Sequence, residues 1–225
     1  MKALRRSVSG ALLAIGATAL ISACGSQPGG TDGDVWTGTQ THIDCCATTR
    51  LPSPDSTKTL VFEPDDDERA HVRLSAGWLR QLEVAVLEGP AAASWAPDSE
   101  SFFISDGEGS GQTSTFRLFR APNDGSAREI PAAHAAAVSA YRSHVRCPAE
   151  AFDPEVWGLG WSRDGSRAVV LVQASIHEPC GSASNYMVMA LATDDGELVE
   201  QYDTAEAARR FADLIPANVL DVTTP

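Results

Sequence analysis

A short polar turn built around an aspartate occurs three times in this chain, and it is the feature that most restricts the fold. Its copies stand in PSPDSTKTLVF, SWAPDSESFFIS and GWSRDGSRAVVLV. They place Asp55, Asp98 and Asp164 at matching positions, separated by 43 and 66 residues. Each carboxylate can accept backbone N–H groups and so start a tight turn between two strands. A four-stranded antiparallel meander takes about 40 residues, so the spacing predicts repeated meanders.

Period-two alternation of apolar and polar side chains predicts that most of the chain is β-strand. Turn residues that tolerate a positive φ separate the strands at 123–125 (Asn-Asp-Gly) and 194–196 (Asp-Asp-Gly). Trp95 and Trp161 stand three residues before the second and third turn aspartates, at strand ends that we expect to be buried. The predicted strands are 59–62, 71–76, 81–88, 101–105, 113–120, 167–176, 185–192 and 197–202.

Two segments depart from this alternation and predict amphipathic helices that pack against the strands. Residues 131–145 are rich in alanine and begin with proline, which favours the first turn of a helix. Residues 203–215 begin with Asp203 as N-cap and end before Pro216. A helical insertion at 131–155 accounts for the longer interval between the second and third turns.

The residues around the turns resemble a known repeat. Trp95-Ala96-Pro97-Asp98 and Trp161-Ser162-Arg163-Asp164-Gly165, together with Ser53-Pro54-Asp55, resemble the W-S-P-D-G repeats of TolB-like (WD40-like) β-propellers. The resemblance extends over most of residues 50–203 and implies a mainly β fold, a small propeller-like array of about three antiparallel β-meander blades. TolB-like propellers usually have six blades and act as protein-interaction platforms. In this interpretation the residues that hold the blades together are Asp55, Trp95, Asp98, Trp161 and Asp164.

A meander whose turns are merely similar is the alternative to the propeller, because turns with these residues are common.

The N-terminus predicts export and lipidation. Lys2, Arg5 and Arg6 precede an apolar stretch that is short for a membrane-spanning helix, as in a secretory signal peptide at 1–23. The stretch ends in Ile-Ser-Ala-Cys, which resembles the lipobox of bacterial lipoproteins, so Cys24 is the expected lipidation site. An ordinary signal peptide that happens to end near a cysteine is the alternative.

Lipid chains on Cys24 would hold the protein at a membrane surface, at about 0.8 kcal/mol per buried methylene. Residues 24–40 are rich in glycine and short polar residues, so we expect a flexible tether, followed by a single β domain at 41–217 and a tail at 218–225. Gly25 stands where aspartate would signal inner-membrane retention, which favours the outer membrane where the organism has one. The expected location is the cell envelope, facing the periplasm or the cell surface.

The chain is acidic, with 30 acidic against 17 basic residues and a net charge of −13. Nucleic acid binding depends on clustered Lys and Arg, so we expect no nucleic acid partner. The acidity also repels anionic headgroups, which leaves the acyl chains as the membrane anchor.

Four further cysteines predict two disulfide bonds, because an exported chain folds under oxidising conditions. A bond between the neighbours Cys45 and Cys46 would close a strained ring and is the least favoured pairing. The expected bonds join these two residues to Cys147 and Cys180, in either order. The spacing lacks the Cys-x-x-Cys pattern of a metal site, so we expect no metal there.

Motifs of catalysis are missing from the sequence, which has no HExxH, no GxSxG and no glycine-rich phosphate loop. We therefore expect no catalytic residue, no cofactor and no metal. Acidic stretches at 64–68 and 105–111 leave a calcium loop open, although neither matches the EF-hand pattern.

These patterns predict a non-catalytic, lipid-anchored envelope protein with a propeller-like scaffold for protein–protein interaction. Loops 105–112 and 176–184 are the expected contact surface, because loops on a rigid sheet commonly carry recognition. One alternative is an inhibitor or immunity protein against a cell-wall hydrolase, whose basic surface would complement the acidic chain. Another is an enzyme or small-ligand receptor that uses a central pocket of the propeller. The partner, the choice of membrane and the number of blades stay open.

Overall fold

The computed structural model divides the chain into two units, Met1–Gly33 and Asp34–Pro225, and the described residues all lie in the second. The described part of this unit is mainly β, as the sequence predicts, with the helices α1 and α2. The structure describes residues 36–44, 46–67, 69–77, 80–107, 114–146, 153–174, 185–216 and 219.

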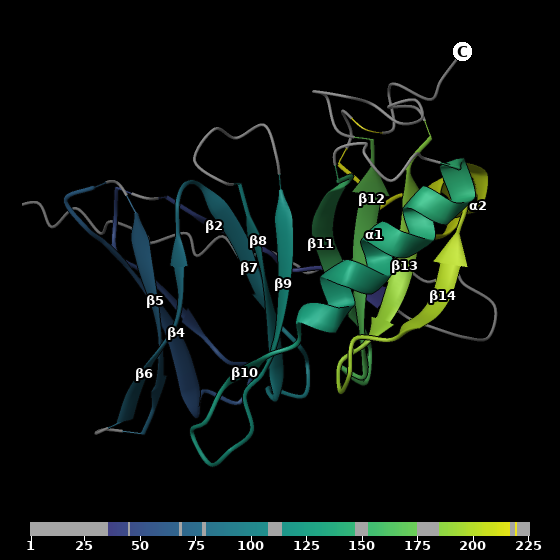
Figure 1. Cartoon of the computed structure of the whole chain (residues 1–225). Coiled ribbons are helices and arrows are strands. Elements are labelled where there is room, and N and C mark those ends of the chain that lie inside the picture. The colour runs from purple at the N-terminus through teal and green to yellow at the C-terminus, as the bar shows by residue number, and fades with distance from the viewer. Residues whose placement is uncertain are drawn as a thin grey trace, which may run out of the picture. The chain divides into compact units, whose positions relative to one another are not determined.

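The described residues form three antiparallel sheets, and each sheet contains four strands that follow one another along the chain (Figure 1). This arrangement confirms the prediction of about three antiparallel strand units. The first sheet consists of β3 (Thr49–Pro52), β4 (Lys58–Pro64), β5 (Ala70–Ala76) and β6 (Arg80–Leu87). The second consists of β2 (Thr41–Ile43), β7 (Ala91–Trp95), β8 (Ser101–Asp106), β9 (Thr115–Arg120) and β10 (Arg128–Glu129). The third consists of β1 (Trp36–Thr37), β11 (Glu155–Ser162), β12 (Arg167–Gln173), β13 (Met187–Ala192) and β14 (Leu198–Tyr202).

Residues 36–44 run along the edges of two sheets, and we call this segment the strap. Its β1 pairs with β11 of the third sheet, and its β2 pairs with β7 of the second. Between them, the Gln40 side-chain amide donates to the carbonyl oxygens of Gly158 at 2.7 Å and Leu159 at 3.2 Å. The sequence assigned residues 36–40 to the flexible tether. The structure places them in the fold, because their polar groups find partners in β11.

The second sheet lies between the other two and is buried on both faces (Figure 1). All six residues of β8 are buried. Phe102 faces the first sheet and stacks on Phe119, with 4.7 Å between the ring centroids. Phe103 faces the third sheet and stacks on Trp161 at 5.0 Å. Successive side chains of a strand point to opposite faces, so these two rings give the central sheet an apolar contact on each side.

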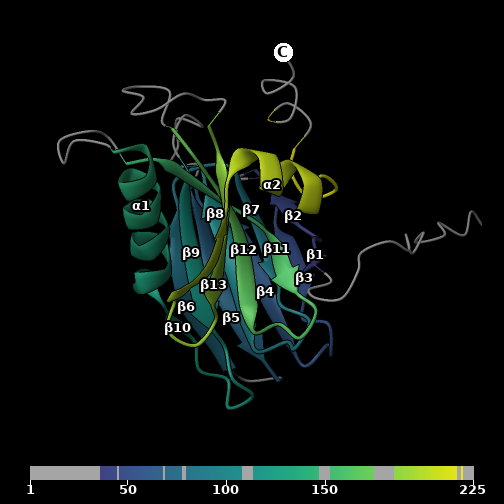
Figure 2. The same ribbon diagram turned by 90° about the vertical axis from the view of Figure 1, so that its right-hand side faces the viewer.

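The outer face of the third sheet is apolar, and α2 (Thr204–Arg210) covers it (Figure 2). Asp203 caps this helix, as predicted, by accepting the backbone N–H of Glu206 at 2.9 Å. The buried residues that meet between helix and sheet include Leu159, Val169, Leu171, Val188 and Ala207.

The helix α2 is shorter than predicted, since it ends at Arg210 and not at residue 215. Phe211 leaves the helical conformation, with a φ of −123°. Its ring packs on Trp36 at 5.4 Å and on Tyr202 at 5.1 Å between centroids. Packing of one aromatic side chain onto the sheet and the strap therefore stops the helix before the proline does.

The outer face of the first sheet, at the opposite side of the stack, is polar. Arg73 of β5 forms an ion pair with Glu63 of the neighbouring β4. His71 lies between two carboxylates, with Nε2 3.2 Å from Asp65 and Nδ1 3.0 Å from Glu83. The described stack of sheets is thus open, and it ends in ion pairs on one side and in a helix on the other.

The helix α1 (Pro131–Val145) has the predicted bounds and lies beside β9 (Figure 2). It packs into the core that the second and third sheets share. The hydroxyl group of Tyr141 in this helix donates a hydrogen bond to the Asn185 carbonyl oxygen at 3.1 Å. None of the described helices is long and apolar enough to cross a bilayer. The core-facing residues of α1 are Ala133, Ala137, Val138 and Tyr141.

Close packing of the strap depends on a glycine of β11. A Cβ atom on Gly160 would collide with the carbonyl oxygen of Thr37 and lie 3.0 Å from the Cα of Gly38. Since backbone atoms cannot move aside as a flexible side chain can, any larger residue at 160 must displace the strap.

Replacing Gly160 by alanine should destabilise the fold by about 3 kcal/mol, because the added methyl group forces the strap away from β11. Urea unfolding followed by circular dichroism measures the change. Gly77→Ala is the control: a Cβ at Gly77 would meet nothing within 4 Å, so only its φ of 66° costs stability, about 1 kcal/mol. Equal losses at the two positions would contradict the close packing of the strap.

Candidate functional site

The three repeat turns contain the same hydrogen bond. In each turn, the backbone N–H of the second residue after the aspartate donates to its Oδ1. The residue between them has a left-handed conformation, which glycine adopts most readily and serine at some cost. The donor and acceptor residues are Thr57 and Asp55 at 3.0 Å, Glu100 and Asp98 at 2.8 Å, and Ser166 and Asp164 at 3.0 Å. The left-handed residues are Ser56 at φ 61°, Ser99 at 63° and Gly165 at 76°.

The three turns also contact one another, and we call them the turn column. Ser99 Oγ in the second turn accepts the backbone N–H of Asp55 in the first at 3.1 Å. The carboxyl group of Asp98 packs against Gly165 of the third turn, where a Cβ would lie 2.8 Å from Asp98 Cγ. Segments far apart in sequence therefore meet at one end of the sheets.

The two repeat tryptophans join neighbouring sheets. Trp95 Nε1 donates to the Leu51 carbonyl oxygen at 3.0 Å, which links the second sheet to the first. Trp161 Nε1 donates to Ser94 Oγ at 3.0 Å, which links the third sheet to the second. Each indole is buried, so these bonds form in a low-dielectric interior where an unmade bond would be costly.

The turn aspartates differ in acidity although their backbone bonds are alike. The Ser53 hydroxyl donates to Asp55 at 2.7 Å and lowers its pKa from 3.8 to about 2. The Ser162 hydroxyl donates to Asp164 at 2.6 Å, and the pKa of Asp164 is likewise about 2. Asp98 has an alanine at the matching position, and desolvation of its carboxyl group against the third turn raises its pKa, although part of the side chain stays exposed.

Most of the predicted cysteine sites lie outside the described residues, so lipidation and disulfide pairing stay predictions. The expected contact loops 105–112 and 176–184 lie largely outside them as well. Within the described ranges, no group of three or more His, Cys, Asp or Glu side chains is placed to hold a metal ion. The cysteines outside the description are Cys24, Cys45, Cys147 and Cys180, whereas Cys46 is described and exposed.

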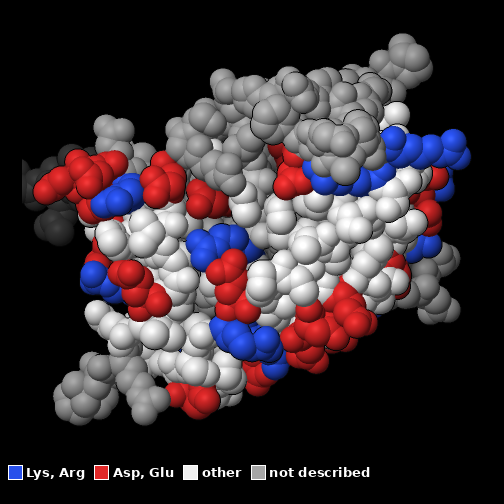
Figure 3. Space-filling model, in the orientation of Figure 1, with Lys and Arg blue, Asp and Glu red and all other residues white. Residues whose placement is uncertain are grey.

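Acidic and basic side chains are interspersed on the face of the molecule in Figure 3. Many of the charges form ion pairs, for example Arg117 with Glu129 at 2.6 Å and Arg120 with Glu100 at 3.1 Å. The α1 region differs in composition, since residues 131–146 contain no acidic side chain in a chain with 30 acidic residues.

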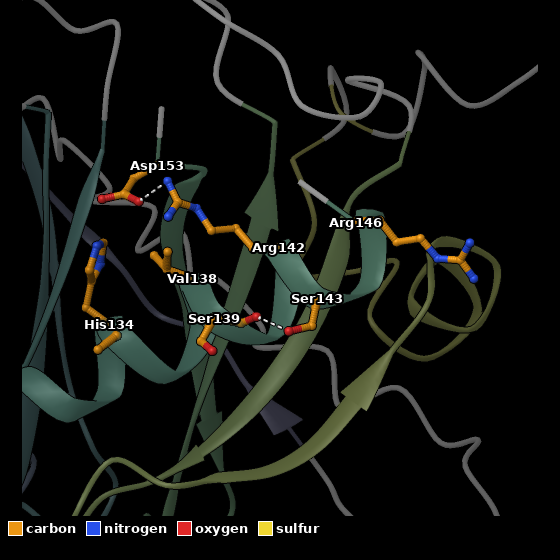
Figure 4. A pocket seen from close by; sticks show the side chains of 8 residues that line it. His134, Val138, Ser139, Arg142, Ser143, Arg146 and Asp153 are labelled. Atoms are coloured by element: carbon orange, nitrogen blue, oxygen red, sulfur yellow. Dashed lines mark hydrogen bonds and ion pairs between the residues drawn. The ribbon is translucent and has the colours of Figure 1, made fainter. Parts of the chain in front are cut away.

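A broad hollow of about 740 Å³ runs along α1, and we call it the α1 groove (Figure 4). Arg142 forms an ion pair with Asp153 at 2.9 Å, and Ser143 Oγ donates to the Ser139 carbonyl oxygen at 2.8 Å. Arg146 points away from these residues in Figure 4, and its side chain is exposed. The lining residues are His134, Ala135, Val138, Ser139, Arg142, Ser143, Arg146 and Asp153.

A smaller hollow of about 280 Å³ lies where the strap, the third sheet and the C-terminal segment meet, and we call it the strap pocket. Trp157, Leu159 and Leu171 supply apolar side chains, and Gln40 and Gln173 supply amide groups. Sequence reasoning missed this pocket because its walls come from distant segments that share no local motif. Its lining is completed by Gly158, Pro216 and Val219.

Comparisons with protein-family models, with curated proteins and with solved structures give no match. The class of the fold therefore follows from its own geometry, a mainly β domain of three antiparallel sheets in an open stack. Its function has to follow from the chemistry of particular sites, since a fold of this kind can carry many functions.

Asparagine substitutions of the three turn aspartates should change the melting temperature in different ways. At pH 7, Asp55→Asn and Asp164→Asn should each lower the melting temperature, because a hydrogen-bonded carboxylate that stabilises the fold is lost. Asp98→Asn should leave it unchanged or raise it slightly. The amide keeps an oxygen for the Glu100 N–H while removing a partly desolvated charge. Differential scanning calorimetry measures the three melting temperatures.

The contribution of each turn aspartate to folding stability should also depend on pH, and its sign should differ between Asp98 and the other two. The lowered pKa values of Asp55 and Asp164 stabilise the folded state above the ordinary value of 3.8, and this contribution is lost as the pH falls towards about 2. The loss of melting temperature in the Asp55→Asn and Asp164→Asn variants should therefore become smaller as the pH falls from 3.8 to about 2. The raised pKa of Asp98 favours folding below 3.8 and stops doing so as the pH rises through its folded value, so any gain from Asp98→Asn should appear only at the higher pH. Three parallel pH profiles would contradict this assignment.

Proposed function

We propose that this chain is a lipid-anchored protein of a bacterial cell envelope, and that its β domain is a non-catalytic, propeller-like scaffold that binds another protein. Cys24 would carry the lipid, and neither a cofactor nor nucleic acid would take part. One observation supports the proposal above all: the repeat residues join the three sheets into one stack.

A stack joined in this way is suited to presenting a surface. The second sheet is packed on both faces, and close-packed interiors resist deformation. The turn column holds one end of the strands. Because antiparallel strands alternate in direction, the strand ends at Asp106, Ser114, Ala174 and Asn185 lie at the other end, where binding segments on a rigid scaffold are expected.

The position of the strap favours an interaction scaffold over a propeller enzyme. Propeller blades surround a central channel, which is where a pocket-based activity would lie. Here the strap pairs with β7 and β11, the first strands of their four-strand runs, and so covers the edges that such a channel would need.

The α1 groove is the surface that we assign to the partner. It combines an apolar floor at Val138 with hydroxyl groups and two arginines, a mixture that is usual in protein interfaces. Arg142 is paired with Asp153, whereas Arg146 is exposed and would favour a partner segment of negative charge and set its orientation.

Cys24→Ser should release the protein from the membrane fraction, because the thiol that would carry the acyl chains is absent. The strap begins 12 residues after Cys24, so the native domain would stay within about 40 Å of the bilayer. Fractionation of cells and mass spectrometry of the N-terminal peptide check both points. A chain that stays membrane-bound with serine at this position would contradict the anchor.

Photo-crosslinking in intact cells should identify the partner. A benzophenone side chain in place of Ser139, which is exposed in the α1 groove, should capture one dominant envelope protein. The same group in place of Gln81, exposed on the first sheet, is the matched control and should not capture it. Adding Arg146→Glu should remove most of the product, because it reverses the one exposed arginine charge of the groove. Absence of a specific crosslinked product from position 139 would contradict the scaffold proposal.

A further inference from the structure

Lysine is rare in this chain, and one of its lysines is buried. The sequence contains two, Lys2 in the predicted signal peptide and Lys58 at the start of β4, whereas every other basic residue is arginine. Only 2% of the surface of Lys58 is exposed. A lysine is almost never buried to this extent unless its charge is paired, so the surroundings of its ammonium group need an explanation.

The hydrogen-bond partners of the Lys58 ammonium group are neutral. Its Nζ donates to the Ala121 carbonyl oxygen and to Asn123 Oδ1, each at 2.8 Å. The ring centroid of Trp95 lies 6.0 Å from Nζ, at the outer limit of a cation–π contact. Among the described residues, no Asp or Glu forms an ion pair with Lys58. An ammonium group has three N–H donors, so the two hydrogen bonds leave one donor and the whole positive charge to be satisfied.

The carboxylates of the two adjoining turns are bonded to other groups. The Thr57 hydroxyl donates to both carboxylate oxygens of Asp55 at 2.9 Å. Asp124 Oδ1 accepts the backbone N–H and the hydroxyl of Ser126, at 2.8 Å and 2.6 Å. Residues 78–79 of the hairpin beside them lie outside the description, and they are Trp and Leu, which carry no carboxylate. The positive charge of Lys58 is therefore not neutralised by an ion pair with either turn.

Lys58 lines a hollow of about 450 Å³, which we call the lysine pocket. The first sheet supplies residues 57–58 and 76–77 of its walls, and the loop 123–125 that follows β9 of the second sheet supplies the rest. A Cβ atom on Gly77 would meet nothing within 4 Å, so the hollow is open on that side. The ammonium group is bonded directly to the wall, because Asn123 both lines the pocket and accepts from Nζ.

We propose that the lysine pocket binds a small monocarboxylate. The ligand carboxylate accepts the third N–H of Lys58 and a side-chain N–H of Asn123, whose Oδ1 already accepts from Lys58. The ligand thus brings the counter-charge to a buried cation, in a charge-assisted hydrogen bond that is about twice as strong as a neutral one. This assignment goes beyond the proposed scaffold function and does not depend on the α1 groove.

The charges around the pocket select a ligand with one negative charge. Among the described residues that line it, Lys58 is the one cation and Asp124 is the one anion. A phosphate dianion would keep an unpaired negative charge near Asp124, and the net charge of −13 repels dianions more than monoanions. The volume of about 450 Å³ lies within the range of small-molecule sites.

Calorimetric titration of the full chain in neutral phosphatidylcholine nanodiscs, with empty nanodiscs as the blank, tests the proposal. The probes are butyrate, its neutral isostere butyramide, and inorganic phosphate. We expect saturable binding of one butyrate ion, and binding of butyramide and of phosphate at least about tenfold weaker. Affinities for butyramide or phosphate that equal or exceed the affinity for butyrate would overturn the assigned class of ligand. Absence of binding by all three probes would overturn the site.

Substitutions at two positions separate ligand binding from folding. Lys58→Met keeps the length of the side chain and removes its charge, so it should weaken butyrate binding at least about tenfold. Circular dichroism checks that this variant folds.

Asn123→Asp gives the decisive measurement, because it leaves Lys58 in place. The introduced carboxylate should pair with the ammonium group, raise the melting temperature and weaken butyrate binding about ten- to a hundredfold. Asn185→Asp makes the same change at the other end of the strands and should bind butyrate as the native chain does. Native affinity in the Asn123→Asp variant would overturn the role of Lys58, and the crosslink from Ser139 reports on the scaffold function separately.

Discussion

Both faces of the central sheet are apolar, and the need to bury both is the constraint on which the rest of the structure depends. Phe102 and Phe103 stand next to each other in β8 and face opposite sheets, so β8 needs a neighbour on each side. Each flanking sheet then has an outer face of its own. The first sheet presents ion pairs such as Arg73 with Glu63, which water tolerates, and the third sheet is covered by α2. The stack can therefore stay open.

The repeated turn lets a single chain build these packed layers. Its aspartate organises each turn locally, and its tryptophan donates to the sheet before it, so one short motif acts both within a sheet and between sheets. The copies are not equivalent. Asp55 and Asp164 have a serine two residues earlier, whereas Asp98 has an alanine there and lies against Gly165. The same residue type is consequently more acidic in two turns and less acidic in the third.

The strap shapes two regions of the fold. By covering the edges at β7 and β11 it favours binding on outer surfaces over chemistry in a central channel. By placing Gln40 against Gly158 and Leu159 it builds one wall of the strap pocket.

Local signals made much of the fold predictable: β8 from its apolar run, α1 from its proline start, and the cap at Asp203. The same reasoning expected buried strand ends at Trp95 and Trp161 but did not delimit β7 and β11, which are rich in alanine and glycine. Gly158 has no side chain because Phe103 of another sheet occupies that space, and Gly160 has none because the strap does. The sequence by itself determined turns, caps and strand periodicity, since these depend on residues a few positions apart. Only the tertiary structure decided that the turns touch, that Asp98 differs from its counterparts and that the α1 groove and the strap pocket form, because each depends on atoms brought together from distant segments.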